Sequence, residues 1–284
     1  MSLTQILAKK TVFVRALPSE ERDNYMAARR RDQTQAKEEL SMFKQRIKAG
    51  CLKMLDWGIR KISDQKPLRR PYYEDQYNMT LRDWLIYHQN DIVFDQVKWM
   101  GSPALKNVLD AWIYQEILYE VQPDVLIEIG SRYGGSTKYF ADIMGILGKG
   151  EVLSIDMDRS VYELEHERVT ALTGNSSNPE ILSAVKERCK NKTVMVIQDG
   201  DHRMHQVLED LKDYSKFVSI NSYFIIEDGI VDLFHHGDSL GFEEKGPLAA
   251  IEEFLSYNSH FVIDSSRERY ILTYNPKGFL KRIS

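Results

Sequence analysis

Short apolar runs alternate with helical stretches through the second half of the chain. The runs are rich in Val and Ile, and the stretches between them have the spacing of helices. Alternation of this kind is typical of buried parallel strands joined by crossover helices. The runs are VLIEIG (125–130), EVLSIDM (151–157), TVMVIQDG (193–200) and SYFIIEDG (222–229), with VTALTG (169–174) as a further candidate. The pattern predicts a doubly wound α/β domain.

The end of the chain predicts an antiparallel pair. HFVIDSS (260–266) and RYILTYN (269–275) are separated by only a few polar residues, as in a hairpin at a sheet edge. Together with the five preceding runs, they give a mostly parallel seven-stranded sheet that ends in an antiparallel hairpin.

The first 90 residues differ in composition from the rest of the chain. Residues 19–62 are rich in Glu, Lys, Ala, Leu and Met and lack proline, which predicts one or two amphipathic helices, and residues 66–80 carry prolines and tyrosines like a linker or flap. We expect residues 1–90 to form a helical extension and linker for substrate selection or oligomerisation, and residues 91–284 to form the catalytic domain. A helix within residues 99–124 carries an apolar stripe for the core, Leu109, Trp112, Ile113, Ile117 and Leu118.

Composition excludes several classes of protein. The 284 residues are 43% hydrophobic and carry a formal net charge of −4, so a sizeable core is expected and nucleic-acid binding has no compositional support. No segment approaches the ~20 apolar residues of a membrane span. The cysteines are only two and far apart, which favours a reducing cytoplasm over a disulfide framework.

A glycine-rich turn follows the first predicted strand. Glu128 closes that strand, and Gly130, Tyr133, Gly134 and Ser136 lie in the turn. The spacing G-x-x-x-G-G lacks both the G-x-G-x-x-G of dinucleotide sites and the lysine of a P-loop. Either this is an ordinary turn, or its glycines let the backbone approach a ligand, in which case the Glu128 carboxylate suits a cationic amino-acid group.

An acid also closes the second predicted strand. Asp156 follows the glycine turn by about the interval at which an acidic residue accepts the hydroxyls of a ribose, and Asp158 lies two residues on. A glycine turn followed by a ribose acid indicates a cofactor of the adenosine type.

Carboxylates follow two more strands. Asp199 follows the third run, and Glu227 and Asp228 follow the fourth. Neighbouring strand ends would bring these three acids together, and their mutual repulsion calls for a hard divalent cation such as Mg²⁺, or less often Mn²⁺ or Ca²⁺. His202 is the histidine nearest to that position. The alternative is that Asp201 or Asp228 caps the helix that follows it.

Other chemistries stay open at this point. His236 and Asp238 form an H-x-D pair that, with His260, resembles the ligand triad of a non-haem iron oxygenase. A nicotinamide-dependent oxidoreductase and a non-catalytic adenosine-binding module are further alternatives. Residues 232–246 have the glycines and polarity of an active-site lid.

These residues resemble the family of bacterial cephalosporin hydroxylases and rhamnosyl O-methyltransferases. The resemblance spans about residues 98–233 and rests on WMGSPALKNVLDAWIYQEILYEVQPDVLIEIGSRYGGS, LSID, QDGDH and YFIIEDGIVD. The sequence departs from the commonest pattern at Ile129 and Gln198, neither of which is an expected ligand.

The resemblance implies a Rossmann-like class I methyltransferase fold that binds S-adenosylmethionine. It places the cofactor against Glu128, Gly130, Tyr133, Gly134, Ser136, Asp156 and Asp199, and Mg²⁺ or another divalent cation on Asp199, Glu227 and Asp228, with His202 as the base. We expect methyl transfer to a hydroxyl of a sugar or a polyhydroxylated natural product. A homo-oligomer is expected because the predicted N-terminal helices expose apolar stripes.

Overall fold

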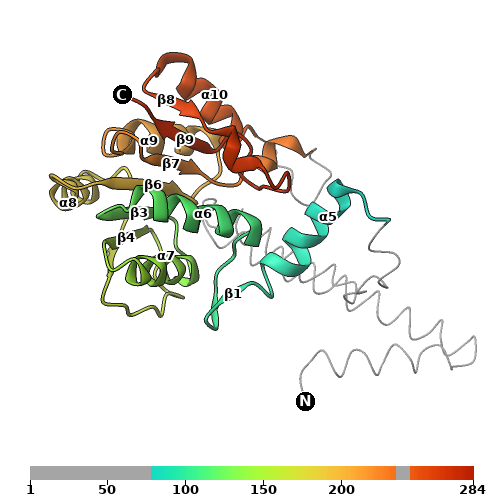
Figure 1. The fold of residues 1–284 in the computed structure, drawn as a ribbon, viewed down its shortest axis with the longest axis horizontal. Coiled ribbons are helices and arrows are strands. Elements are labelled where there is room, and N and C mark those ends of the chain that lie inside the picture. The colour runs from blue at the N-terminus through green and yellow to red at the C-terminus, as the bar shows by residue number, and fades with distance from the viewer. Residues whose placement is uncertain (1–77, 235–243) are drawn as a thin grey trace, which may run out of the picture. The chain divides into compact units, whose positions relative to one another are not determined.

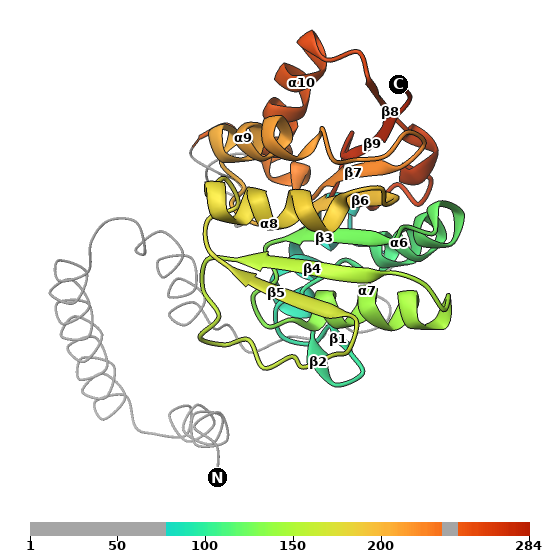
Figure 2. The same cartoon turned by 90° about the vertical axis from the view of Figure 1, so that its left-hand side faces the viewer.

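A seven-stranded sheet runs through the part of the chain that the computed structural model describes, residues 78–234 and 244–284 (Figure 1). Its strand order is β5-β4-β3-β6-β7-β9-β8, which Figure 2 shows from one edge to the other. The strands are β3 (Val125–Ile129), β4 (Glu151–Asp156), β5 (Val169–Thr173), β6 (Val194–Gln198), β7 (Tyr223–Ile226), β8 (Phe261–Ile263) and β9 (Phe279–Arg282). β1 (Lys98–Trp99) and β2 (Ser102–Pro103) form a separate antiparallel pair.

The five strands from β5 to β7 are parallel, as the Val- and Ile-rich runs predict. All residues of β3 and β6 are buried, because helices cover both faces of a central parallel strand. VTALTG forms β5. The carboxyl ends of β4, β3, β6 and β7 therefore lie side by side at one edge of the sheet, in that order.

The antiparallel pair at the end of the chain is confirmed, but its second strand was predicted in the wrong place. β8 lies where it was expected, whereas its partner is β9, which lies between β7 and β8. Residues 269–275 form no strand, because the N–H groups of residues 271–273 donate to carbonyls within residues 268–271, and Thr273 and Tyr274 bond to α6. Thr273 Oγ1 and the N–H of Tyr274 both donate to the carboxylate of Asp110.

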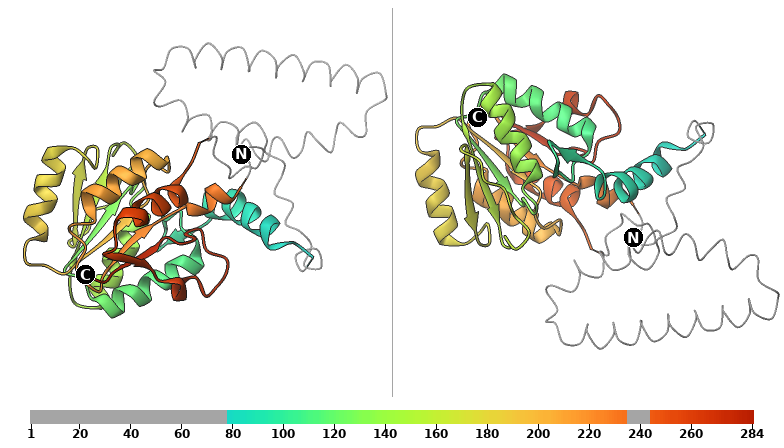
Figure 3. Two further views of the ribbon diagram at one scale, coloured as in Figure 1. Left: turned by 90° about the horizontal axis from the view of Figure 1, so that it is seen from above. Right: turned by 90° about the horizontal axis from the view of Figure 1, so that it is seen from below.

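Helices cover the two faces of the sheet in separate groups. α8, α9 and α10 pack on one face, and α6 and α7 pack on the other (Figure 3). Their bounds are α6 (Val108–Val121), α7 (Gly135–Ile146), α8 (Pro179–Cys189), α9 (Met204–Tyr214) and α10 (Pro247–Tyr257). Ile113, Ile117 and Leu118 of α6 are buried as predicted, but Trp112 is 59% exposed and Tyr114 lies in the core instead.

A smaller apolar cluster lies beside the carboxyl edge. It joins α5 (Leu81–Tyr87) and the π-helix η1 (His88–Val93) to the 3₁₀ helix η2 (Gly229–Leu233) and to Tyr274. A short 3₁₀ helix, η3 (Ser265–Glu268), precedes the loop that carries Tyr274.

The N-terminal extension, most of the linker and the middle of the expected lid lie outside the described residues. Among the residues that are described, none of the helices has the length and apolar character needed to cross a bilayer.

Candidate functional site

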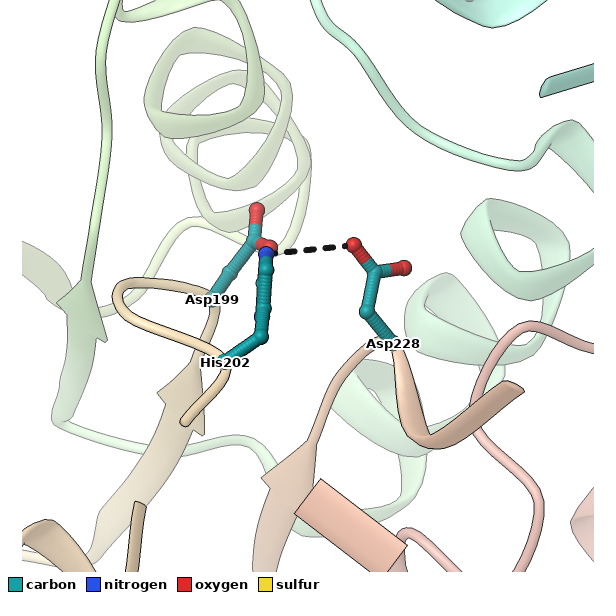
Figure 4. Close-up of side chains that lie close together, drawn as sticks. All are labelled: Asp199, His202 and Asp228. Carbon is teal, nitrogen blue, oxygen red and sulfur yellow. Dashed lines mark ion pairs between the residues drawn. The ribbon is translucent and has the colours of Figure 1, made fainter. Parts of the chain in front are cut away.

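Three side chains meet at the carboxyl edge of the sheet, where β6 and β7 end beside each other. Asp199 directly follows β6, His202 lies three residues later, and Asp228 lies in the turn after β7. One ligand atom of each residue lies within 4.8 Å of the others, and the three side chains approach one another in Figure 4. His202 Nε2 is 3.3 Å from Asp228 Oδ2. The structure therefore brings together three of the four residues predicted for the cation and its base.

Asp201 lies just before α9 but does not cap it, because the N-cap residue is Arg203, whose side chain makes no capping bond. Its Oδ1 accepts the backbone N–H of Arg203 at 2.9 Å, and its carboxylate pairs with the Arg203 guanidinium. Arg203 directly precedes α9. Asp228 directly precedes η2 but makes no side-chain capping bond, so its carboxylate stays directed at the site.

Glu227, the fourth predicted residue, turns into the interior. It is 4% exposed, and its Oε1 accepts a hydrogen bond from Lys106 Nζ at 2.7 Å. Lys106 also pairs with Asp199. Burial and the neighbouring Asp199 raise the pKa of Glu227 well above its usual value, although Lys106 opposes this. Glu227 as a cation ligand stays a prediction.

Lys106 is the site residue that sequence reasoning missed. It lies in the loop between β2 and α6, far along the chain from the strand ends that its ammonium reaches. Burial alone would lower the pKa of Lys106, but Asp199, Glu227 and Glu128 outweigh burial and raise it. A signal was available, since Lys106 is the single charged residue between Lys98 and Asp110.

The backbone at Asp228 adopts a left-handed conformation with φ +57°. Residues other than glycine rarely adopt it, so neighbouring contacts must hold it. The N–H of Asp228 donates to Asn275 Oδ1 at 3.1 Å, and the N–H of Ile230 donates to the carbonyl of Tyr274 at 3.0 Å. The loop before β9 thus fixes the direction of the Asp228 carboxylate.

The glycines of the predicted cofactor turn are required by the protein itself. Gly130 has φ +87°, and a Cβ there would lie 2.2 Å from the carbonyl oxygen of Asp199. Gly134 has φ +81°, and a Cβ there would lie 2.8 Å from the Tyr162 ring. Close packing of the turn therefore explains both glycines, whether or not a ligand also approaches them.

Glu128 lies beneath that turn and is fully buried. Its Oε2 accepts a hydrogen bond from Thr137 of α7, and its Oε1 has no partner among the described residues. Burial raises the pKa of Glu128 to about 7, although Lys106, Ser136 and Thr137 oppose this. A buried oxygen without a partner is costly, so this atom is suited to accept a hydrogen bond from a ligand.

Asp156 lies at the carboxyl end of β4 and contacts the glycine turn. Its Oδ2 accepts the N–H groups of Ser131 at 2.9 Å and Arg132 at 2.8 Å. A carboxylate has about four acceptor positions, so Asp156 can hold the turn and still bind a hydroxyl. The next residue, Met157, is 71% exposed. Sequence reasoning did not single it out, yet it offers an apolar surface beside the acid.

The remaining predicted residues fall around the same turn. Ser136 is buried in the first turn of α7, and Tyr133 is half-buried with the Arg132 guanidinium over its ring. His236 and Asp238, the H-x-D pair, lie outside the described residues. His260 is exposed and bonds to Ser284 Oγ at 2.9 Å.

The group of Asp199, His202 and Asp228 fits a divalent cation. Two carboxylates supply the oxygen ligands that Mg²⁺ prefers, and the imidazole would also suit a softer metal. Lys106 supplies one positive charge to the carboxylates of Asp199 and Glu227, and with Asp228 beside them a further positive charge is needed. The donor set is therefore consistent with the cation that the sequence predicts.

Comparison with known proteins identifies the family. The model of the family "Rhamnosyl O-methyltransferase/CmcI" matches residues 91–283. Rhamnosyl O-methyltransferase of Mycobacterium tuberculosis (strain H37Rv) is 34% identical over 205 residues, which cover 69% of this chain and 82% of the relative. The Mycobacterium leprae protein of that name is 32% identical over 204 residues, with coverages of 69% and 87%.

Solved structures agree with the fold. A CmcI structure described as containing Mg and SAM has a TM-score of 0.53 and 21% identity, and the match covers 76% of this chain and 86% of that one. A CmcI structure with SAH has a TM-score of 0.52 and 20% identity, with coverages of 76% and 94%. The family model and the mycobacterial relatives favour neither an iron oxygenase nor a nicotinamide-dependent enzyme. The chain belongs to the rhamnosyl O-methyltransferase/CmcI family, and it is an S-adenosylmethionine-dependent O-methyltransferase.

Proposed function

We propose that this enzyme methylates a hydroxyl of a sugar or another polyhydroxylated natural product, with Mg²⁺ or another divalent cation as cofactor. The observation that carries the proposal is the placement of Asp199, His202 and Asp228 at the ends of β6 and β7, next to the glycine turn after β3. An acceptor bound at this edge can contact the acids and the methyl donor at once. The mycobacterial relatives are named for a rhamnosyl acceptor, which supports a sugar.

The glycine turn and its two acids are the proposed site for S-adenosylmethionine, which supplies an electrophilic methyl group. Glu128 Oε1 is suited to accept from the amino group of the methionine part, and Asp156 to accept from the ribose hydroxyls. The turn residues Gly130, Tyr133, Gly134 and Ser136 and the acid Asp199 complete the proposed contacts.

Asp199 and Asp228 are proposed cation ligands, and the buried Glu227 is proposed as the third. The cation supplies positive charge that favours ionisation of a nearby hydroxyl. His202 is the proposed general base, because its Nε2 lies 3.3 Å from Asp228 Oδ2 on a side chain that is 22% exposed, and an imidazole is suited to accept a proton near neutral pH. The proton moves to His202 as the acceptor oxygen bonds to the methyl carbon and the carbon–sulfur bond breaks.

Calorimetric titration tests the proposal directly. The purified chain is titrated with S-adenosylmethionine, S-adenosylhomocysteine and NADH, with and without Mg²⁺. We expect micromolar binding of both sulfur compounds and none of NADH. Failure of both sulfur compounds to bind would remove the cofactor assignment. Methylation of rhamnosides in the presence of Mg²⁺, and its loss with EDTA, then tests the acceptor class and the cation.

Two further expectations are proposals about the whole chain. We place the enzyme in the cytoplasm, because its sequence offers only two widely spaced cysteines and the described Cys189 is free and buried. We also retain the homo-oligomer and a role for residues 1–90 in substrate selection or oligomerisation. Size-exclusion chromatography with light scattering tests the oligomer.

A further inference from the structure

We propose that Lys106 is a positioning residue of this site, the internal counter-ion that holds the carboxylates of Asp199 and Glu227 at the ends of β6 and β7 and sets the charge of the site to match a divalent cation. The first part of this role follows from the contacts of Lys106. The second part, the match to a cation, rests on the proposed function.

Lys106 is too deeply buried to contact the hydroxylated substrate that accepts the methyl group. The side chain of Lys106 is 4% exposed and that of Glu227 is 6% exposed, whereas that of Asp199 is 21% exposed. The ammonium thus lies on the interior side of the carboxylates, where water screens it little. A molecule that arrives from solvent meets Asp199 first, so Lys106 acts through the carboxylates that it holds.

The backbone is fixed on both sides of Lys106. Leu105, the preceding residue, has φ +50°, and its side chain packs with the apolar cluster around Tyr274. Asn107, the following residue, donates from Nδ2 to the carbonyl of Leu272 at 2.8 Å and to Asp110 at 3.0 Å. A strained residue and a double anchor next to one buried lysine indicate that the position of its ammonium is maintained at a cost.

The formal charge of the site gives a reason for holding Lys106 in this position. Counted in their ionised forms, the three strand-end carboxylates of Asp199, Glu227 and Asp228 carry with one ammonium a formal charge of −2. This charge is equal and opposite to that of a divalent cation. Without Lys106, a buried Glu227 has no cation beside it until a metal binds, and a buried charge without a partner is strongly destabilising.

A double-mutant cycle in EDTA tests the counter-ion role, with neither cation nor cofactor present. Lys106→Met leaves Glu227 without its partner and should lower the Tm by about 10 °C. Glu227→Gln should lower the Tm less, because the Lys106 ammonium still has its ion pair with Asp199. The double variant should lose clearly less than the two single losses added together.

An exposed pair supplies the matched control. Lys277 Nζ and Glu252 Oε1 are 2.9 Å apart, but both side chains are about half exposed, so Lys277→Met and Glu252→Gln should have small and additive effects. Additive losses at Lys106 and Glu227 would overturn the proposal. If Lys106→Met alone does not fold, the double variant decides, since its folding supports the counter-ion role and its failure to fold contradicts it.

Addition of excess Mg²⁺ or Mn²⁺ tests the match to a cation. The Tm of Lys106→Met should rise more than that of the wild type, because the cation takes over the charge that the ammonium supplied. Lys106→Arg, which keeps the charge, should respond like the wild type. An equal or smaller rise in Lys106→Met contradicts the charge match. If no variant responds to either cation while the cycle is non-additive, the cation of the proposed function is refuted and the counter-ion role is supported.

Discussion

The backbone N–H of Asp228 donates a hydrogen bond to Oδ1 of Asn275 over 3.1 Å and so holds Asp228 in its left-handed conformation. That conformation costs about 1–2 kcal/mol for a residue with a side chain. Asn275 is itself fixed, because its Nδ2 donates to the hydroxyl of Tyr114 at 2.6 Å. The orientation of one proposed cation ligand thus depends on a residue 47 positions later in the chain.

Asn275→Ala should therefore weaken cation binding. Without Oδ1, the turn at Asp228 can relax, and we expect a loss of about tenfold in Mn²⁺ affinity, the equivalent of roughly 1.4 kcal/mol. Electron paramagnetic resonance of free Mn²⁺ measures it. Asn258→Ala, which removes an acceptor for the N–H of His260, is the control and should bind Mn²⁺ like the wild type. Equal Mn²⁺ binding by both variants would refute the positioning role of Asn275.

His202→Ala should lower turnover by about 10²–10⁴-fold, the usual contribution of a general base. The affinity for S-adenosylhomocysteine should stay close to that of the wild type, because the two acids proposed to bind the cofactor directly, Glu128 and Asp156, lie on β3 and β4. Asp228→Ala should lose activity and the response to Mg²⁺ together. His205→Ala, at an exposed position in α9, is the matched control. A parallel loss of cofactor binding in the His202 and Asp228 variants would argue against these roles.

Asp156→Asn should weaken binding of S-adenosylhomocysteine by about 10–100-fold, which corresponds to one hydrogen bond to a charged acceptor. Calorimetry measures the affinity. Asp158→Asn is the control, since among the described residues the Asp158 carboxylate accepts from its own local turn at Ser160. Because Asp156 also holds the glycine turn, the Tm of both variants is recorded. An unchanged affinity in Asp156→Asn would remove the ribose assignment.

The sequence predicts the sheet well because its central strands are buried on both faces. Continuous Val and Ile runs such as VMVIQ have little alternative to a buried strand, and an acid after such a run must lie at the sheet edge. The error at residues 269–275 has a physical cause. Tyr270 and Ile271 are apolar like strand residues, yet they are 40% and 75% exposed, and Asp110 takes the hydrogen bonds of the residues that follow.

Strand-end acids were predictable, but their partners were not. Asp199, His202 and Asp228 follow predicted strands, so topology alone places them together. Lys106 and Asn275 lie in loops without periodicity, and only the packing of those loops shows what the two side chains reach. Local pattern determines the strands here, whereas contacts between distant loops determine the direction of each carboxylate.

Gly130→Ala should prevent stable folding or lower the Tm by more than about 10 °C. The new Cβ would lie 2.2 Å from the carbonyl oxygen of Asp199, which is backbone and cannot move aside. Gly148 also has positive φ, at +71°, but nothing lies within 4 Å of a Cβ there. Gly148→Ala should thus cost only about 1 kcal/mol. Similar Tm values for the two variants would show that the turn is not held by this contact.

The pH dependence of stability should contain a contribution from His88, which stacks on Trp84 with ring centroids 4.4 Å apart and contacts the hydroxyl of Tyr274 through Nδ1 at 2.6 Å. Burial lowers the pKa of His88 to about 4, against about 6.5 in the unfolded chain. Between these values the unfolded chain binds a proton that the folded chain does not. Stability from this group is therefore complete above pH ~6.5 and is lost as the pH falls toward ~4.

His88→Phe keeps the aromatic stacking on Trp84 and removes the titrating group. At pH 7.5 it should be slightly less stable than the wild type, because the hydrogen bond to Tyr274, worth about 1 kcal/mol, is lost. Between pH 7.5 and pH 5 the Tm of the wild type should fall further than that of His88→Phe, by about 5 °C. His260→Phe, at an exposed position, should keep the wild-type slope. If all three proteins lose stability in parallel, the acid sensitivity of the fold arises elsewhere, because neutral His88 would then contribute nothing to it.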